Sequence, residues 1–421
     1  MTSRTSTEEL WERQKQTTVE NHHCGEQRVV NMSAKFEVSE RIKSLPPYLF
    51  AAVDSKKREA IGKGMDVIDL GVGDPVEPTP THIIDQLCKS AYDRTNHRYP
   101  SYSGMMAFKE AVARWYRKRA GIDLDPKTQV ITLIGAKEGI AHIPFALVNP
   151  GDKVLVPSPA YPVYRNSTIL AGADPVIMPL LKDNGFLPDL GAIDSNTARK
   201  AKMMFLNYPN NPTGAVATLD FFHQVVEFAR GYNIVVCHDA AYLELGLDGY
   251  CAPSFLEASG ALEIAVEFYS LSKTYNMTGW RIGAAAGNAD IIAALGAVKT
   301  NIDSGAFQAV QWAGVQALEG PQGCVEQQKR IYEQRRGLLL EALRSMGLQA
   351  DPSQATCYLW CPVPHGFTST QFAAELIERI GVVVAPGVGF GQYGEGFIRL
   401  SLTVETDRLK EAARRMKTIR F

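Results

Sequence analysis

From residue 130 onward, short runs of β-branched and other apolar residues alternate with amphipathic stretches. In the stretch 219–230, for example, Phe222, Val225, Val226 and Ala229 recur at helical spacing. Strand, helix and strand at this period predict βαβ units, which build a mostly parallel sheet covered by helices on both faces. We therefore expect an α/β fold with strands over Val130–Ile134, Lys153–Val156, Met203–Asn207, Ile234–His238, Val266–Ser270 and Ile282–Ala286.

The rest of the chain suggests further parts. A helical region from about Gln322 to Met346 leads into a second set of strand-like and helix-like segments that ends at Phe421. We expect a large domain over residues 81–319 and a smaller α/β domain over residues 35–80 and 320–421. Residues 1–34 are polar and lack the apolar core of a signal peptide, so we expect a flexible extension, and a translation start at Met32 is a hypothesis.

Composition excludes several classes of protein. The formal net charge is −1, which argues against binding nucleic acid or an anionic membrane by bulk charge. We find no run of about 18 apolar residues, so the sequence predicts no transmembrane helix. The seven cysteines are scattered without a CxxC pair, which favours a reducing cytoplasm over a disulfide framework or a zinc ribbon. We expect no metal site, and interpret His22 and His23 as solvated residues of the polar extension.

The segment SLSKTYNMTGWRIG, residues 270–283, carries the first chemical signal. Lys273 comes just after an apolar run, with Ser270 and Ser272 beside it, and Arg281 follows eight positions later. A lysine buried at a strand end is costly unless it has a task, such as forming a Schiff base with a carbonyl cofactor. Serine hydroxyls and a guanidinium nearby suit a phosphate. From spacing alone, an ordinary surface lysine stays equally open.

Two more segments follow apolar runs. In NYPNNPTGAV, residues 207–216, prolines and a glycine indicate a fixed turn, and Asn211 offers an amide donor. In VVCHDAAYLEL, residues 235–245, Asp239 ends a run and Tyr242 follows. A buried carboxylate there needs a facing cation, and a protonated pyridine nitrogen is one. Taken alone, Asp239 is equally interpretable as a helix N-cap.

In this order, Asn211, Asp239, Tyr242, Lys273 and Arg281 form a specific combination. From about Tyr48 to its end, the chain resembles the fold-type I, class I/II aminotransferases, which depend on pyridoxal 5′-phosphate. The resemblance implies a mostly parallel central sheet in a large domain with a smaller α/β domain. It also implies amino acid and 2-oxo acid substrates and a homodimer with shared active sites.

The resemblance assigns roles around the cofactor. Lys273 is expected to bind it covalently and to act as the general base, Asp239 to pair with the pyridinium nitrogen, and Tyr161 to stack on the ring. Tyr242 and Asn211 are expected at its phenolic oxygen. The phosphate is expected to contact Ser270, Ser272, Arg281, the helix-opening turn Gly135, Ala136 and Lys137, and Tyr99 of the neighbouring subunit.

Substrate contacts are implied in the same way. Arg399 in GFIRLSLT is expected to hold the α-carboxylate as a bidentate pair, although a surface arginine on an edge strand is the alternative. Gly73 in GVGDP is expected at the same carboxylate, although a turn glycine is an equally good interpretation. The substrate-binding set is completed by Tyr48, Lys137, Tyr161 and Asn211.

The segments 45–50, 68–80 and 135–142 are most similar to the LL-diaminopimelate aminotransferases within this family. Those enzymes convert tetrahydrodipicolinate and glutamate to LL-diaminopimelate and 2-oxoglutarate, in lysine biosynthesis, and ping-pong kinetics are expected. Tyr102 stands where some members carry a glutamate for the distal ammonium, and Ser304 is a candidate contact from the partner subunit. The alternatives are an aspartate, alanine or aromatic aminotransferase, a pyridoxal phosphate β-lyase, or a non-catalytic protein with this fold.

Overall fold

The computed structural model describes residues 37–46 and 51–421. The chain divides into two compact units, residues 1–43 and 44–421. In the described part of the first unit, the short helix α2 (Glu40–Lys43) carries an ion pair of 2.7 Å between Lys43 and Glu40. Tyr48, Met32, His22 and His23 lie outside the described residues, as does the predicted extension 1–34. In the described ranges no helix has both the length and the hydropathy that a membrane span requires.

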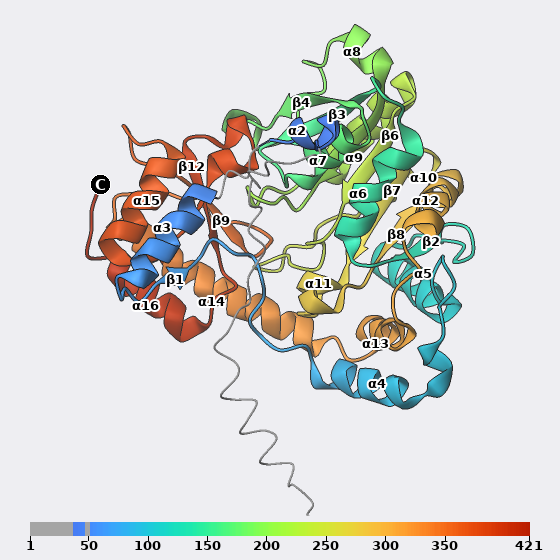
Figure 1. The fold of residues 1–421 in the computed structure, drawn as a ribbon, viewed down its shortest axis with the longest axis horizontal. Coiled ribbons are helices and arrows are strands. Elements are labelled where there is room, and N and C mark those ends of the chain that lie inside the picture. The colour runs from blue at the N-terminus through green and yellow to red at the C-terminus, as the bar shows by residue number, and fades with distance from the viewer. Residues whose placement is uncertain (1–36, 47–50) are drawn as a thin grey trace, which may run out of the picture. The chain divides into compact units, whose positions relative to one another are not determined.

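A seven-stranded sheet forms the centre of residues 44–421 (Figure 1). Its order is β2-β8-β7-β6-β5-β3-β4, and all neighbours are parallel except β8, which is antiparallel to β2 and β7. The strands are β2 (Val130–Leu133), β3 (Lys153–Ser158), β4 (Asp174–Pro179), β5 (Ala201–Asn207), β6 (Val235–Asp239), β7 (Ala265–Ser270) and β8 (Gly283–Gly287). The predicted α/β fold is confirmed, and six strands lie within two residues of their predicted bounds.

Strand β4 was not predicted. Its sequence, DPVIMP, begins and ends with residues that disfavour strands. It pairs only with β3 at one edge of the sheet, where a proline sacrifices no ladder hydrogen bond on its open side.

Alternating side chains along the strands bury both faces of the sheet. In β5, Met203 and Phe205 pack with α6 (Ala136–Leu147), α7 (Val163–Leu170) and α12 (Ala289–Ile302). Met204 and Leu206 pack on the other face, in a core that includes α4 (Thr81–Tyr92), α5 (Met106–Ala120), α9 (Leu219–Tyr232) and α13 (Gln308–Glu319). Shorter helices are α8 (Ser195–Lys200), α10 (Ala261–Ile264) and α11 (Leu271–Thr274).

A second core lies beside the sheet, to the left in Figure 1. A three-stranded antiparallel sheet, β11-β12-β9, and the parallel pair β1-β10 are packed with four helices. These elements are α3 (Ala51–Gly62), β1 (Ile68–Asp69), α14 (Gly323–Ser345), β9 (Tyr358–Pro362), α15 (Ser369–Ile380), β10 (Val382–Val383), β11 (Ala385–Pro386), β12 (Phe397–Ser401) and α16 (Thr406–Met416). The helix α14 confirms the predicted helical region. The domain boundaries at residues 80 and 320 stay a prediction.

The parallel register places three strand ends together. Asn207 at the end of β5 lies opposite Asp239 at the end of β6, and β7 ends two residues beyond the partner of Asp239, at Ser270. Ligands of parallel sheets bind at this carboxyl edge. The chemically interesting side chains are therefore expected there.

Candidate active site

Lys273 lies in α11, directly after β7, and its Nζ donates a 2.5 Å hydrogen bond to the carbonyl oxygen of Gly73. Burial lowers the pKa of Lys273, and the positive charges of Arg399 and Arg281 lower it further. A larger share of this amine is therefore neutral than of an exposed lysine. A neutral amine is the form that attacks a carbonyl carbon.

Asp239 ends β6 as a buried carboxylate. Its Oδ2 accepts a 2.7 Å hydrogen bond from the hydroxyl of Tyr164, and its Oδ1 accepts one of 3.3 Å from the backbone of Ala241. Burial raises the pKa of Asp239, although the hydrogen bond from Tyr164 opposes this. No helix begins at Asp239, so the N-cap interpretation is wrong. Asp239 forms no ion pair with another described residue, although the neighbouring His238 favours its charge, and a bound cationic ligand could supply such a pair.

Arg399 on β12 faces the turn after β5. Its Nη1 donates to Oδ1 of Asn211 at 2.7 Å, and its Nη2 donates to the carbonyl oxygen of Gly71 at 2.7 Å. The guanidinium carbon lies 4.1 Å from the ring centre of Tyr358 and 4.7 Å from that of Phe390. Arg399 is only 7% exposed, so the interpretation as a surface arginine is wrong, and among residues 37–46 and 51–421 its Nε has no hydrogen-bond partner. A buried guanidinium with a free donor calls for an anion.

The turn after β5 is held to Asp239 by a single amide. Asn207 donates from Nδ2 to the backbone carbonyl of Asp239 at 2.8 Å, and its Oδ1 accepts from the backbone N–H of Asn211 at 2.8 Å. Because Oδ1 of Asn211 is engaged by Arg399, the Nδ2 group of Asn211 is its available donor. Asn211 therefore offers a donor next to the guanidinium of Arg399, in a turn that Asn207 links to the backbone of Asp239.

Tyr358 connects several of these residues. Its hydroxyl lies 3.1 Å from the hydroxyl of Tyr242, and the two rings meet edge to face. A Cβ added to Gly73 would lie 2.0 Å from the Tyr358 hydroxyl. A glycine is therefore required at position 73 because the Tyr358 side chain approaches its backbone closely. The interpretation of Gly73 as a simple turn glycine does not account for this approach. The predicted residues Gly73, Tyr242, Lys273, Asn211 and Arg399 are thus brought together.

A second group of backbone and cationic donors surrounds the start of α6. Gly135 has a φ of +76°, and a Cβ there would lie 2.3 Å from Nη2 of Arg281. The N–H groups of Ala136 and Lys137 lie in the first turn of α6, where the helix itself supplies no acceptor. Ser270 caps α11 by accepting from the N–H of Ser272. This arrangement suits a dianionic phosphate.

The other predicted residues have less defined places. The Nζ of Lys137 lies 5.8 Å above the ring of Tyr161, which meets Tyr164 edge to face at 6.0 Å. Tyr99 and Tyr102 are 87% and 53% exposed, and Ser304 is exposed. The roles assigned to these five residues stay predictions.

Glu138 follows the turn 135–137, which suits a phosphate, and forms a compact charged cluster with residues of α12. Lys299, fully buried, lies 2.8 Å from Glu138 and 3.0 Å from Asp303, and His142 lies 2.7 Å from Glu138. Burial alone would raise the pKa of Glu138, but hydrogen bonds from His142 and Lys299 hold it below its ordinary value. Glu138, His142 and Asp303 have the spacing of a metal site, but Lys299 already supplies the cation.

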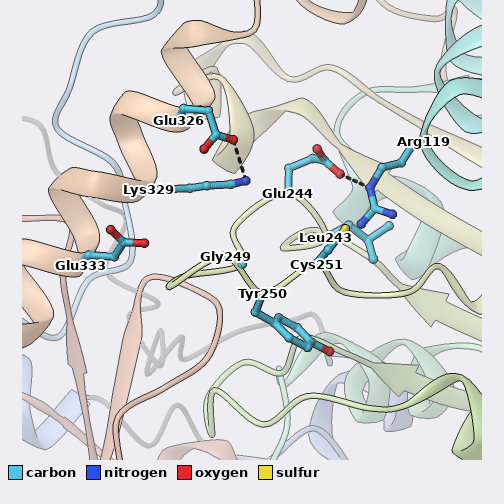
Figure 2. Close-up of a pocket in the computed structure, with 10 residues that line it drawn as sticks. Arg119, Leu243, Glu244, Gly249, Tyr250, Cys251, Glu326, Lys329 and Glu333 are labelled. Carbon is cyan, nitrogen blue, oxygen red and sulfur yellow. Dashed lines mark hydrogen bonds and ion pairs between the residues drawn. The ribbon is translucent and has the colours of Figure 1, made fainter.

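A cavity of about 270 Å³ lies away from these residues, between α14 and the loop 243–251 (Figure 2). Its charged groups already pair with one another: Arg119 donates to Glu244 at 2.8 Å, and Lys329 to Glu326 at 2.9 Å. Glu333 accepts from the backbone of Asp248 at 2.7 Å. Each charged side chain that lines the cavity thus already has a polar partner.

Sequence reasoning missed Tyr164, Tyr358 and Asn207. Tyr164 lies in the first turn of α7, three residues after the predicted Tyr161, and this nearness in sequence is the one local signal for it. Tyr358 is brought to the site by β9, far along the chain, and no local signal identifies it.

Comparison with known proteins agrees with this geometry. The family model of aminotransferase class I and II matches residues 65–416. LL-diaminopimelate aminotransferases from Syntrophobacter fumaroxidans and Moorella thermoacetica are 57% and 56% identical, over 92% and 90% of this chain and 100% and 97% of theirs. The solved structure of substrate-bound BacF from Bacillus subtilis is 38% identical with a TM-score of 0.86, over 91% of this chain and 98% of that one. These matches confirm the predicted family. The chain therefore belongs to the class I and II aminotransferases.

Proposed function

We propose that this protein is an LL-diaminopimelate aminotransferase, which exchanges amino groups between LL-diaminopimelate and 2-oxoglutarate by ping-pong kinetics. The observation that carries the proposal is the buried guanidinium of Arg399, which is hydrogen-bonded to Asn211 in the cluster that contains Lys273 and whose Nε has no partner in the part of the chain that the structure describes. The substrate assignment is supported by relatives of that name at 51–57% identity.

The family depends on pyridoxal 5′-phosphate, and three features of this structure fit that cofactor. Asp239 is a buried carboxylate that forms no ion pair within the described ranges, and a pyridinium nitrogen would supply one. Gly135 and Arg281 approach closely beside the first turn of α6, which suits the phosphate. Lys273 has a lowered pKa, which suits a bond to an aldehyde carbon. When bound, the cofactor supplies an electron sink for the electrons of a broken C–H bond.

The protein's own residues then bind the substrate and move a proton. Arg399 is proposed to hold the α-carboxylate, since a guanidinium recognises a carboxylate by paired hydrogen bonds. The rings of Tyr358 and Phe390 lie against it and exclude water, which strengthens the electrostatic attraction. Neutral Lys273 is proposed to accept the proton from the α-carbon of the amino acid and to return a proton in the reverse half-reaction.

A homodimer with shared active sites is part of the proposal. Tyr99 and Phe307 are 87% and 46% exposed and come from neighbouring segments, since Gln308 donates to the carbonyl oxygen of Arg98 at 3.1 Å. Exposed aromatic residues gathered in this way are typical of interfaces. Phe307→Glu should yield monomers by sedimentation velocity, with reduced activity. A variant that stays dimeric and fully active contradicts the shared site.

A cytoplasmic location is also proposed. Six cysteines lie in the described ranges, and each is a free thiol. Free thiols, two of them exposed at Cys88 and Cys251, suit a reducing compartment. Fractionation of the native host, with activity measured in each fraction, tests this location.

The experiment that tests the function follows the cofactor's absorbance, at about 420 nm for the oxidised form, in single half-reactions. LL-diaminopimelate should bleach it, 2-oxoglutarate should restore it, and Lys273→Ala should show neither change. Bleaching by aspartate, alanine or an aromatic amino acid without a response to LL-diaminopimelate would overturn the substrate assignment. Release of pyruvate and ammonia from a β-substituted amino acid would indicate a β-lyase instead. A protein that takes up no cofactor would contradict the proposal that the chain is an enzyme.

A further inference from the structure

The segment Leu70–Thr79 joins β1 to α4 and carries Gly73, whose carbonyl oxygen accepts the hydrogen bond from Lys273. One end is attached to β12 and the residues just after it. Ser401 donates its backbone N–H to the carbonyl of Leu70 at 2.7 Å, and the Thr403 hydroxyl donates to that of Val72 at 2.9 Å. Arg399 donates to Gly71 within the same stretch. The beginning of the segment is thus fixed to the strand that carries Arg399.

The other end of the segment is attached near Lys273. The hydroxyl of Thr79 donates to the carbonyl oxygen of Asn276 at 2.7 Å. Asn276 lies three residues after Lys273 and has a φ of +54°. The segment therefore runs from the strand that carries Arg399 to the turn that follows Lys273.

Between these ends, Glu77 is the one side chain of residues 73–78 that forms a hydrogen bond or an ion pair with another residue of the described part of the chain. It forms a short ion pair with Arg335 of α14, and its other oxygen lies 3.5 Å from Nε2 of Gln328. The side chains of Arg335 and Glu77 are 3% and 19% exposed. Removing one partner of so buried a pair leaves the other charge without compensation.

Arg335 has further partners that make it a junction. Its Nη1 donates to the carbonyl oxygen of Leu402 at 3.0 Å, and its Nε donates to the hydroxyl of Thr406 at 3.1 Å. Gln328 completes the connection, since its Oε1 accepts from Nδ2 of Asn276 at 3.1 Å. The carboxylate of Glu77 is therefore linked to the end of β12 through Arg335 and to the Lys273 turn through Gln328.

From these contacts we infer that Glu77 is a positioning residue for substrate binding. Through Arg335 and Gln328 it sets the place of Gly73 relative to both Arg399 and Lys273. It touches neither the proposed substrate nor the proposed cofactor contacts. Its loss should therefore weaken binding of the α-carboxylate more than it slows proton transfer. This inference rests on the proposed role of Arg399 in substrate binding.

The test is the glutamate half-reaction of the holoenzyme, followed in single turnovers that separate binding from chemistry. For Glu77→Gln we expect the apparent dissociation constant of glutamate to rise about tenfold and the limiting rate to stay within about twofold. Glu77→Asp, which keeps the charge, should recover part of the affinity. The absorbance of the bound cofactor should be unchanged in both variants.

The matched control is Asp248→Asn. It removes the 2.6 Å ion pair of Arg336, a buried neighbour of Arg335 on α14. The polar partners of Asp248 within the described residues are Arg336 and Glu333, and neither lies in the segment 70–79. It should lower thermal stability without changing the affinity for glutamate. Equal affinities in Glu77→Gln and Asp248→Asn would overturn the inference, as would a fall in the limiting rate alone.

A second variant keeps the test decisive if Glu77→Gln does not fold. Gln328→Met removes the amide that joins Glu77 to Asn276, and it should weaken glutamate binding about threefold. Unchanged binding would overturn the inference. Failure of the proposed function gives a different result. If the wild-type protein reacts with glutamate but not with LL-diaminopimelate, the substrate assignment is wrong, but the effect of Glu77→Gln on glutamate binding can still be measured.

Discussion

The hydroxyl of Tyr164 donates a 2.7 Å hydrogen bond to the carboxylate of Asp239, and both side chains are buried. Tyr164 also stacks on Phe205 of β5 with ring centres 5.2 Å apart, which fixes its orientation. The hydrogen bond favours the ionised carboxylate, and burial disfavours it. A charged Asp239, oriented by Tyr164, is the form that would pair with a pyridinium nitrogen.

Tyr164→Phe should therefore weaken binding of pyridoxal phosphate. Loss of one such hydrogen bond corresponds to about 1–1.5 kcal/mol, or about five- to tenfold in the dissociation constant. The measurement is a titration of apo-protein with the cofactor. Tyr116→Phe is the control, because Tyr116 donates at 2.9 Å to the equally buried Glu267, outside the candidate site. The hypothesis fails if both variants bind the cofactor like the wild type.

Gly73→Ala should reduce both stability and activity. The new Cβ would lie 2.0 Å from the Tyr358 hydroxyl, so Tyr358 must move away from Arg399 and Tyr242. Overpacking of this kind costs about 1–3 kcal/mol in the free energy of unfolding, measured in urea. Gly231→Ala within α9 meets nothing within 4 Å and should instead stabilise by about 0.5–1 kcal/mol. A Gly73→Ala protein of normal stability and activity would contradict the close approach.

The lowered pKa of Lys273 predicts how cofactor uptake depends on pH. Only the neutral amine attacks the aldehyde, so the rate of uptake by apo-protein should rise with pH through an inflection below 10.5, the ordinary lysine value. Arg399→Gln should move the inflection upward, because it removes a positive charge that disfavours protonation. Stopped-flow absorbance gives the rates, and pyridoxine 5′-phosphate, which lacks the aldehyde, is the control ligand. An inflection at or above 10.5 contradicts the prediction.

Lys299→Met should destabilise the fold strongly. It would leave Glu138 and Asp303 near one another without the buried ammonium that lies 2.8 Å and 3.0 Å from them. Breaking a buried charge cluster in this way costs about 3–5 kcal/mol, measured by chemical denaturation. Lys63→Met breaks an exposed pair with Glu59 and should have no measurable effect. A small loss in Lys299→Met would show that the two carboxylates become protonated or hydrated at little cost.

The amino-acid sequence alone predicts the βαβ pattern and the sheet edge at which the candidate site residues lie. Six strands were predicted within two residues, because apolar periodicity and turn residues are local properties of the chain. Lys273, Asp239 and Asn211 are predicted as site residues because each follows such a strand, and parallel strands bring their carboxyl ends to one edge. The family resemblance adds Arg399 and Gly73 to the predicted site, since local sequence patterns do not distinguish them from a surface arginine and a turn glycine.

The contacts that position these residues are seen only in the folded structure. Tyr164 meets Asp239 across 75 positions, Arg399 meets Asn211 across 188, and Lys273 meets Gly73 across 200. Contacts at such separations depend on packing between elements, so periodicity, which describes one element at a time, does not contain them. The same reason explains why the sequence does not predict β4, an edge strand with two prolines. Its strand conformation depends on pairing with β3, its single neighbour in the sheet.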